Sequence, residues 1–140
     1  MIVVDAGVVL ALILPLPYSD AAATTVHALK NAREELYAPA LLEYEVCSAL
    51  RRAVSREILD EESAVACLDL IEQIRIRPVT AAHSLHRRAL AWAARIQHSK
   101  AYDAHYLALA EEMGCALLTT DLRLAESARA LGATWVETLS

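Results

Sequence analysis

The chain has 140 residues, of which 56% are apolar, and it carries a formal net charge of −5. This length and apolar content predict one compact domain, residues 1–140, and exclude a disordered protein. The negative charge excludes a generic polybasic nucleic-acid binder, although locally clustered arginines remain compatible with RNA. No stretch of about eighteen apolar residues predicts a membrane span, and no basic segment precedes the apolar run 8–14 as in a secretory signal, so we expect a cytoplasmic protein.

The chain opens with a short β-branched run, Ile2-Val3-Val4, that stops at Asp5. A continuous apolar run of this kind is typical of a strand buried on both faces of a parallel sheet. Ligands of open α/β sheets bind at the carboxyl ends of strands, where the strand order reverses, so Asp5 marks the expected site. The next segments predict a helix over 7–14, a helix over 19–35 capped by Ser19 and Asp20, and a strand over 36–38. They are followed by a helix after Pro39, a helix that begins with the acids at 60–62, and an edge strand over 75–79.

Glu45 lies in the helix after Pro39, three residues after Leu42 and four before Ala49. This helix has a single apolar stripe, and Glu45 flanks that stripe instead of pointing cleanly at water. Nearly buried glutamates are scarce unless they are paired or coordinated. Glu43 projects further from the stripe, and we expect it to be solvated.

The last third of the chain repeats one pattern after a long helix that Thr80 is expected to cap and that reaches towards His98. The pattern is a helix, a glycine that closes it, and a strand. This rhythm predicts an α/β fold with a five-stranded parallel sheet and helices on both faces. The segments concerned are a helix over 102–113, Gly114 and a strand over 115–118, then a helix over 122–131, Gly132 and a strand over 133–136.

Asp103 and Asp121 stand where two of these helices begin, and either one alone is explained as a helix cap. If the first strand and the strand over 115–118 are neighbours, however, Asp5 and Asp121 share one edge of the sheet. Asp103 and Glu45, near helix N-termini, can lie on that edge too. Four close carboxylates raise one another's pKa, and a hard divalent cation such as Mg²⁺ or Mn²⁺ relieves their repulsion. The set contains no histidine or cysteine, which argues against zinc.

Four blocks stand in order along the sequence: Ile2-Val3-Val4-Asp5, Pro39 to Arg52, Tyr102 to Ala110, and Leu117-Leu118-Thr119-Thr120-Asp121. Together they resemble a PIN domain, and most closely the VapC-type toxins of prokaryotic toxin–antitoxin pairs. The resemblance implies a three-layer α/β/α sandwich and a Mg²⁺- or Mn²⁺-dependent endoribonuclease in which water attacks in line and leaves a 5′-phosphate. It also implies that Asp5, Glu45, Asp103 and Asp121 form the acidic quartet that binds metal, with Thr119 orienting a carboxylate or a water. Whether one or two metal ions bind is left open.

The resemblance further implies a VapB-like antitoxin as partner, a homodimer, and contact with DNA only through the antitoxin. The high apolar content agrees loosely with such interfaces. One position departs from the family pattern: many relatives have serine, threonine or asparagine two residues after the first aspartate, where this chain has Gly7. Without that polar support, a water or a main-chain N–H takes its place, or the enzyme is slow.

Cations near the acids in sequence are candidates for contact with RNA phosphates, and the best of them are Lys100, Arg51 and Arg123. Solvated or ion-paired surface positions are the ordinary alternative for each. His105 falls two residues after Asp103, away from it on the helix, so we expect a structural role. The other histidines, at 27, 83, 86 and 98, are expected to be solvated.

Two rival interpretations stay open. A receiver-like phosphoryl-handling domain also places acids at a sheet edge, but it requires paired acids after the first strand and a lysine after a late strand, and this chain has a lone acid and no lysine beyond Asp121. A catalytically inactive PIN-like module that binds proteins is the second rival, supported by Gly7 alone. Metal-stimulated RNA cleavage that Asp103→Asn abolishes would separate the nuclease from both.

Overall fold

The computed structural model describes residues 1–139, and in it five strands form one parallel sheet in the order β3-β2-β1-β4-β5. β1 pairs on one side with β2 and on the other with β4, where Val4 lies beside Leu118. The predicted edge position of the proline-containing strand is confirmed, since β3 pairs only with β2. The strands are β1 (Ile2–Val4), β2 (Leu36–Pro39), β3 (Arg77–Val79), β4 (Ala116–Thr119) and β5 (Val136–Thr138).

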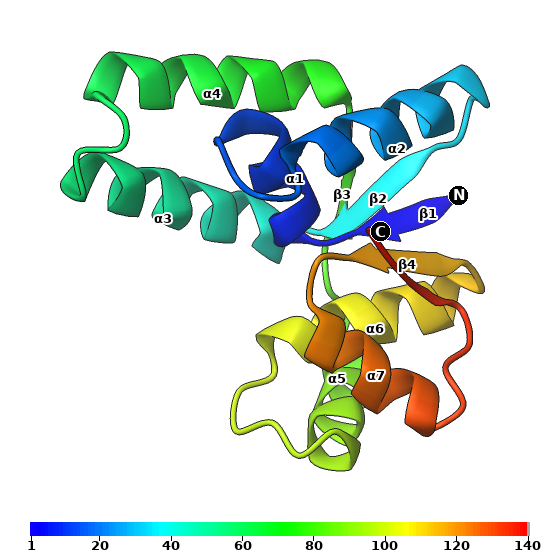
Figure 1. Ribbon diagram of the computed structural model, residues 1–140. Coiled ribbons are helices and arrows are strands. Elements are labelled where there is room, and N and C mark those ends of the chain that lie inside the picture. Colours follow the sequence, from blue (N-terminus) through cyan, green and yellow to red (C-terminus); the bar gives the residue numbers. More distant parts are fainter. Residues whose placement is uncertain (140) are drawn as a thin grey trace.

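Helices cover both faces of this sheet, which confirms the three-layer arrangement (Figure 1). The chain steps outwards from β1 to β2 to β3, then crosses back to β4 and continues to β5. Because crossovers between parallel strands are right-handed, this reversal of direction places the two groups of helices on opposite faces. One face carries α1 (Ala6–Ile13), α2 (Ser19–Asn31), α3 (Leu41–Ser55) and α4 (Glu61–Ile74), and the other carries α5 (His83–Arg95), α6 (Tyr102–Met113) and α7 (Leu122–Ala130).

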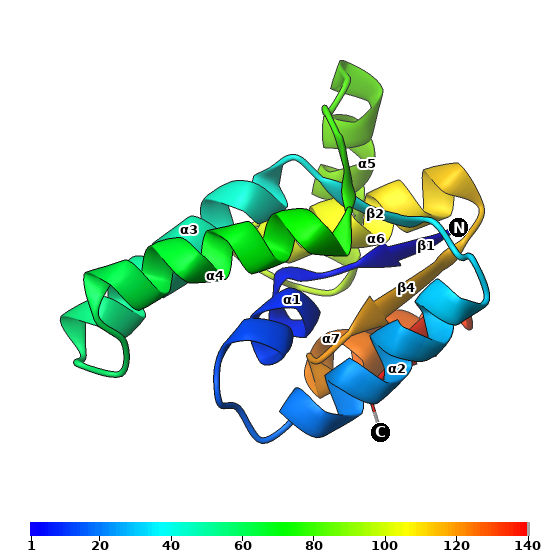
Figure 2. The ribbon, with the colours of Figure 1, turned by 90° about the horizontal axis from the view of Figure 1, so that it is seen from above.

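The core is centred on β1 and α6. Val3 of β1 and Leu107 of α6 are fully buried, and α6 packs against β1, β2 and β4 while α5 covers its outer side. Figure 2 shows α3 and α4 extending together beyond the sheet, whereas α6 lies along it. No helix within residues 1–139 is both long enough and apolar enough to cross a bilayer. The strand order reverses between β1 and β4, and Asp5 stands at that point, as predicted.

Element boundaries differ from the predictions at the connections. The N-cap of α2 is Tyr18, and neither Ser19 nor Asp20 caps the helix; the Ser19 hydroxyl instead donates to the Leu14 carbonyl (2.7 Å), closing the turn between α1 and α2. The same helix ends at Asn31, four residues before the predicted end.

Thr80 does not cap α5, which begins at His83 with Ala82 as N-cap. Residues 80–82 are needed to carry the chain from the edge strand towards the opposite face. β5 likewise starts at Val136 and not at residue 133, because the Ala133 N–H is still bonded to the Ala128 carbonyl (3.0 Å) at the end of α7.

Candidate functional site

Asp5 follows β1 directly and caps α1, with its Oδ1 accepting a hydrogen bond from the Val8 N–H (2.9 Å). Its Oδ2 accepts a bond from the Thr119 hydroxyl. The side chain is buried, and burial raises the pKa of Asp5 from 3.8 to about 6, although the hydrogen bonds from Thr119 and from main-chain N–H groups lower it. Among residues 1–139, no basic side chain forms an ion pair with Asp5. The buried negative charge of Asp5 is therefore unfavourable unless a cation binds next to it.

Thr119 links two of the acids at the end of β4. It is completely buried, donates its hydroxyl hydrogen to Asp5 and accepts a bond from the Asp121 main-chain N–H (2.9 Å). Asp121 caps α7 through Oδ1, which accepts from the Leu124 N–H (3.0 Å), and its side chain is exposed. The cap interpretation is thus correct for Asp121, while the pairing of β1 with β4 places it on the same sheet edge as Asp5.

Asp103 lies in the first turn of α6 but does not cap it, because the N-cap is Ala101 and no side-chain cap bond is present there. The cap interpretation is therefore wrong for Asp103. Its side chain is half-buried, and burial raises its pKa; the charge of Asp121 raises it further, whereas His98 lowers it. The imidazole Nδ1 of His98 is 3.9 Å from Asp103 Oδ2. Sequence analysis missed this contact, since a loop separates the two residues.

Glu45 is half-buried beside the apolar stripe of α3, as predicted, and Glu43 is exposed. The Oε1 atom of Glu45 accepts a hydrogen bond from the Tyr106 hydroxyl (2.7 Å). Burial raises the pKa of Glu45, the bond from Tyr106 lowers it, and the charge of Asp103 raises it. The sequence provided no indication of the Tyr106 contact, because 61 residues separate the partners.

Asp103 interacts electrostatically with each of the other three acids. Its charge raises the pKa of both Asp5 and Glu45, and the charge of Asp121 raises the pKa of Asp103. In the part of the chain that the structure describes, no three acidic, histidine or cysteine side chains are close enough to ligate one ion. The coordination geometry is thus not preformed. The donors are nevertheless all carboxylate oxygens, one of them buried without a counter-charge, and this set suits a hard divalent cation.

Of the three predicted substrate contacts, two lie beside the acids in the chain. Lys100 is exposed just before α6, and Arg123 is exposed in the first turn of α7. Arg51 lies roughly 9 Å further along α3 than Glu45, and its exposed guanidinium is 4.0 Å from Glu61 of α4.

His105 points away from the acids, as expected. Its Nδ1–H donates to the Ala101 carbonyl (2.7 Å), and its Nε2 lies 2.8 Å from His86 Nδ1 of α5. The pair joins α5 to α6 and has no contact with Asp103.

Gly7 lies beside Asp5, and the place of its missing side chain is occupied. A Cβ added at Gly7 would overlap Thr120 Oγ1 and would lie 3.3 Å from Asp5 Oδ1. The Thr120 main-chain N–H also stabilises the Asp5 carboxylate. The Thr120 side chain, just after β4, therefore fills the space that a side chain at residue 7 would need.

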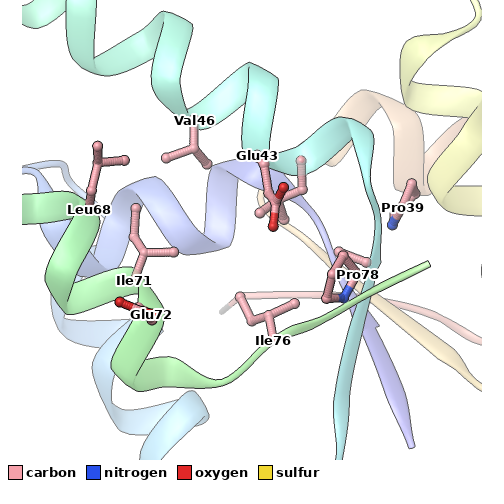
Figure 3. A pocket seen from close by; sticks show the side chains of 10 residues that line it. Pro39, Glu43, Val46, Leu68, Ile71, Glu72, Ile76 and Pro78 are labelled. Atoms are coloured by element: carbon pink, nitrogen blue, oxygen red, sulfur yellow. The ribbon is translucent and has the colours of Figure 1, made fainter. Parts of the chain in front are cut away.

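An apolar groove of about 370 Å³ lies between α3 and α4 and the ends of β2 and β3. Figure 3 shows Val46, Leu68 and Ile71 around it, with Glu43 and Glu72 at its margin. None of the four acids lines this groove. It is therefore separate from the acidic site.

Comparison with known proteins places the chain in a family. The sequence model of the PIN domain matches residues 2–130. Ribonuclease VapC9 of Mycobacterium tuberculosis is 35% identical over 130 residues, which span 93% of each chain. Among solved structures, PAE2754 from Pyrobaculum aerophilum has a TM-score of 0.72 at 23% identity, over 99% of this chain and 83% of that one. VapC20 of Mycobacterium tuberculosis, titled a sarcin-ricin loop cleaving toxin, has a TM-score of 0.65 at 16% identity over 100% of both chains. The chain therefore belongs to the PIN domain family and is related within it to the VapC ribonucleases.

Proposed function

We propose that this protein is a VapC-type ribonuclease that hydrolyses RNA phosphodiester bonds with the help of Mg²⁺ or Mn²⁺. The observation that carries the proposal is the gathering of Asp5, Glu45, Asp103 and Asp121 at one edge of the sheet, where Asp5 is buried without a cationic partner. The identity of 35% to a protein named ribonuclease VapC9 supports RNA as the substrate.

In this proposal Asp5, Glu45, Asp103 and Asp121 would hold the cation. A divalent cation bound there supplies positive charge that stabilises the attacked phosphate and favours deprotonation of the attacking water. Thr119 fixes the spacing between Asp5 and the main chain at Asp121 through its two hydrogen bonds.

The exposed cations Lys100 and Arg123 would bind phosphates of the RNA near the acids, which positions the RNA without reading its sequence.

The test is RNA cleavage by the purified full-length chain in Mn²⁺ or Mg²⁺ and in EDTA. We expect cleavage only with metal, and a loss of at least about 100-fold in Asp103→Asn, since substitution of a charged ligand removes both binding and orientation. Asp69→Asn is the matched control, because Asp69 is an exposed aspartate of α4. Cleavage that persists in EDTA or in Asp103→Asn would contradict the proposal.

The rival interpretations have less support. Membership of the PIN family argues against a receiver-like domain. The inactive module depended on Gly7 alone, and the Thr120 hydroxyl in the space beside Gly7 weakens that argument. Absence of RNA cleavage by the wild-type protein in both metals would nevertheless favour the inactive module.

We also propose a VapB-like antitoxin and a second copy of this chain as protein partners, with DNA reached only through the antitoxin. Large apolar side chains that are exposed on α3 and α4 support a protein partner, because such patches mark interfaces; they include Tyr44 (76% exposed), Val65 (59%) and Leu70 (50%). A short reading frame for a DNA-binding protein directly upstream, and a complex of the two products on co-expression, would be the expected findings. Light scattering on the chain alone tests the homodimer.

A further inference from the structure

Tyr106 is a buried tyrosine whose hydroxyl contacts one of the four acids of the candidate site. Its side chain is 2% exposed, and its O–H donates to Glu45 Oε1 at 2.7 Å. Tyr106 follows Asp103 by three residues on α6, so the two side chains lie on the same face of the helix, one turn apart. The hydroxyl is therefore shielded from solvent on the protein side of Glu45 and Asp103.

The charges of the nearby acids also act on this hydroxyl. The pKa of Tyr106 is raised far above its ordinary value, first by burial and then by the hydrogen bond and charge of Glu45. The charges of Asp5 and Asp103 raise it further. The hydrogen bond to Glu45, at 2.7 Å, is the contact that joins this hydroxyl to the acids.

The hydrogen bond also joins two layers of the fold. Glu45 belongs to α3 on one face of the sheet, whereas Tyr106 and Asp103 belong to α6 on the other face (Figure 1). α6 is held firmly by the sheet and by α5, but α3 leaves the sheet edge and extends beyond it (Figure 2). The bond from Tyr106 therefore ties the Glu45 carboxylate directly to the helix that carries Asp103.

We propose that Tyr106 is a positioning residue for the metal site: its hydroxyl holds Oε1 of Glu45, which would leave Oε2 available to bind a cation. This inference rests on the proposed function, since it assigns a task in metal binding. Partners that orient a ligand in this way typically change metal affinity or activity by about 10- to 100-fold when removed. A purely structural tyrosine, whose hydroxyl merely finds a buried acceptor, would affect stability and leave metal affinity unchanged.

The experiment measures Mn²⁺ binding by the full chain without RNA, using electron paramagnetic resonance of free Mn²⁺. The variants are Tyr106→Phe, Glu45→Gln and the double substitution. We expect Tyr106→Phe to bind Mn²⁺ about 10- to 100-fold more weakly, and the double variant to bind no more weakly than Glu45→Gln alone. Tyr37→Phe is the matched control, because the Tyr37 hydroxyl donates to Glu35 (2.8 Å) at the surface, and it should bind as the wild type does.

Glu45→Asp provides a second route that leaves Tyr106 in place. The shorter side chain keeps its charge but cannot reach the hydroxyl, so Mn²⁺ affinity should fall, and adding Tyr106→Phe should lower it no further. Wild-type affinity in Tyr106→Phe, or losses that multiply in the double variants, would overturn the positioning role while the proposed function stands. If the wild-type chain itself does not bind Mn²⁺, the proposed function fails, and the role of Tyr106 fails with it.

Discussion

Asp5→Asn should stabilise the metal-free protein at neutral pH while removing its response to metal. In the folded chain the pKa of Asp5 is raised from 3.8 to about 6 by burial. Each pKa unit corresponds to about 1.4 kcal/mol, so keeping this carboxylate charged in the folded state costs about 3 kcal/mol above pH 6. Asparagine removes that cost and can still accept the cap bond from Val8. Its amide must, however, meet the Thr119 hydroxyl, so we expect a net gain of about 1–3 kcal/mol.

The sign of the pH dependence follows from the direction of the shift. Between pH 3.8 and about 6 the folded state holds the Asp5 proton more tightly than the unfolded state does. The contribution of Asp5 to stability is therefore fully present below pH 3.8 and is lost as the pH rises through about 6. Asp5→Asn lacks this titration, so its stability relative to the wild type should be highest at pH 7 and above and should fall by about 2–3 kcal/mol between pH 7 and pH 4.

Urea unfolding in EDTA, followed by the fluorescence of Trp92 and Trp135, measures this difference at several pH values. Trp92 is buried and packs edge-to-face against Trp135, so unfolding should change its emission. Adding Mn²⁺ should then stabilise the wild type and leave Asp5→Asn unchanged.

Asp60→Asn is the matched control for the cap. Asp60 caps α4 by accepting from the Ser63 N–H (2.7 Å), but it is exposed, and the hydrogen bonds from Ser63 lower its pKa. Its contribution to stability is present above pH 3.8 and is lost as the pH falls through the lowered pKa, so the substitution should destabilise at neutral pH. If Asp5→Asn were also destabilising, by the same amount at every pH, the account of Asp5 as a strained buried anion would be refuted.

Three further outcomes follow from the site. Thr119→Val keeps the side-chain shape but leaves Asp5 and the Asp121 N–H without their partner, so the free energy of unfolding in urea should fall by about 2–4 kcal/mol; an unchanged value would mean that the hydroxyl is dispensable. Gly7→Ala places a Cβ on Thr120 Oγ1 and should destabilise by about 1–2 kcal/mol. That loss should largely disappear in a Thr120→Ala background, whereas an additive loss would exclude the overlap as its cause. Lys100→Ala should raise KM for RNA and weaken its salt dependence, with Mn²⁺ affinity as the check, since a change there would show that the lysine acts on the metal site instead.

The sequence alone predicted the layers of the fold well because local pattern and global arrangement agree. The unbroken apolar run before Asp5 is a central strand, and the helix over 102–113 that Gly114 closes leads into β4, as expected. The errors lie at connections, such as the starts of α5 and β5. There the boundary depends on how far the chain must travel to reach the next layer, and no local pattern records that distance.

Asp5, Asp103 and Asp121 were candidates from the sequence because each stands at the end of a strand or the start of a helix, and parallel strands bring such ends to one edge. Glu45 was a candidate because it flanks the apolar stripe of its helix. Only the tertiary structure decided what surrounds them. Packing brought the Tyr106 hydroxyl within hydrogen-bond distance of Glu45, and it brought His98 near Asp103. It also set Thr120 in the space beside Gly7 and Arg51 next to Glu61. Backbone periodicity determines which way a side chain faces on its own helix or strand. The distance between residues 61 or 114 positions apart is set by the packing of the two helical layers on the sheet, which no local stretch of sequence contains.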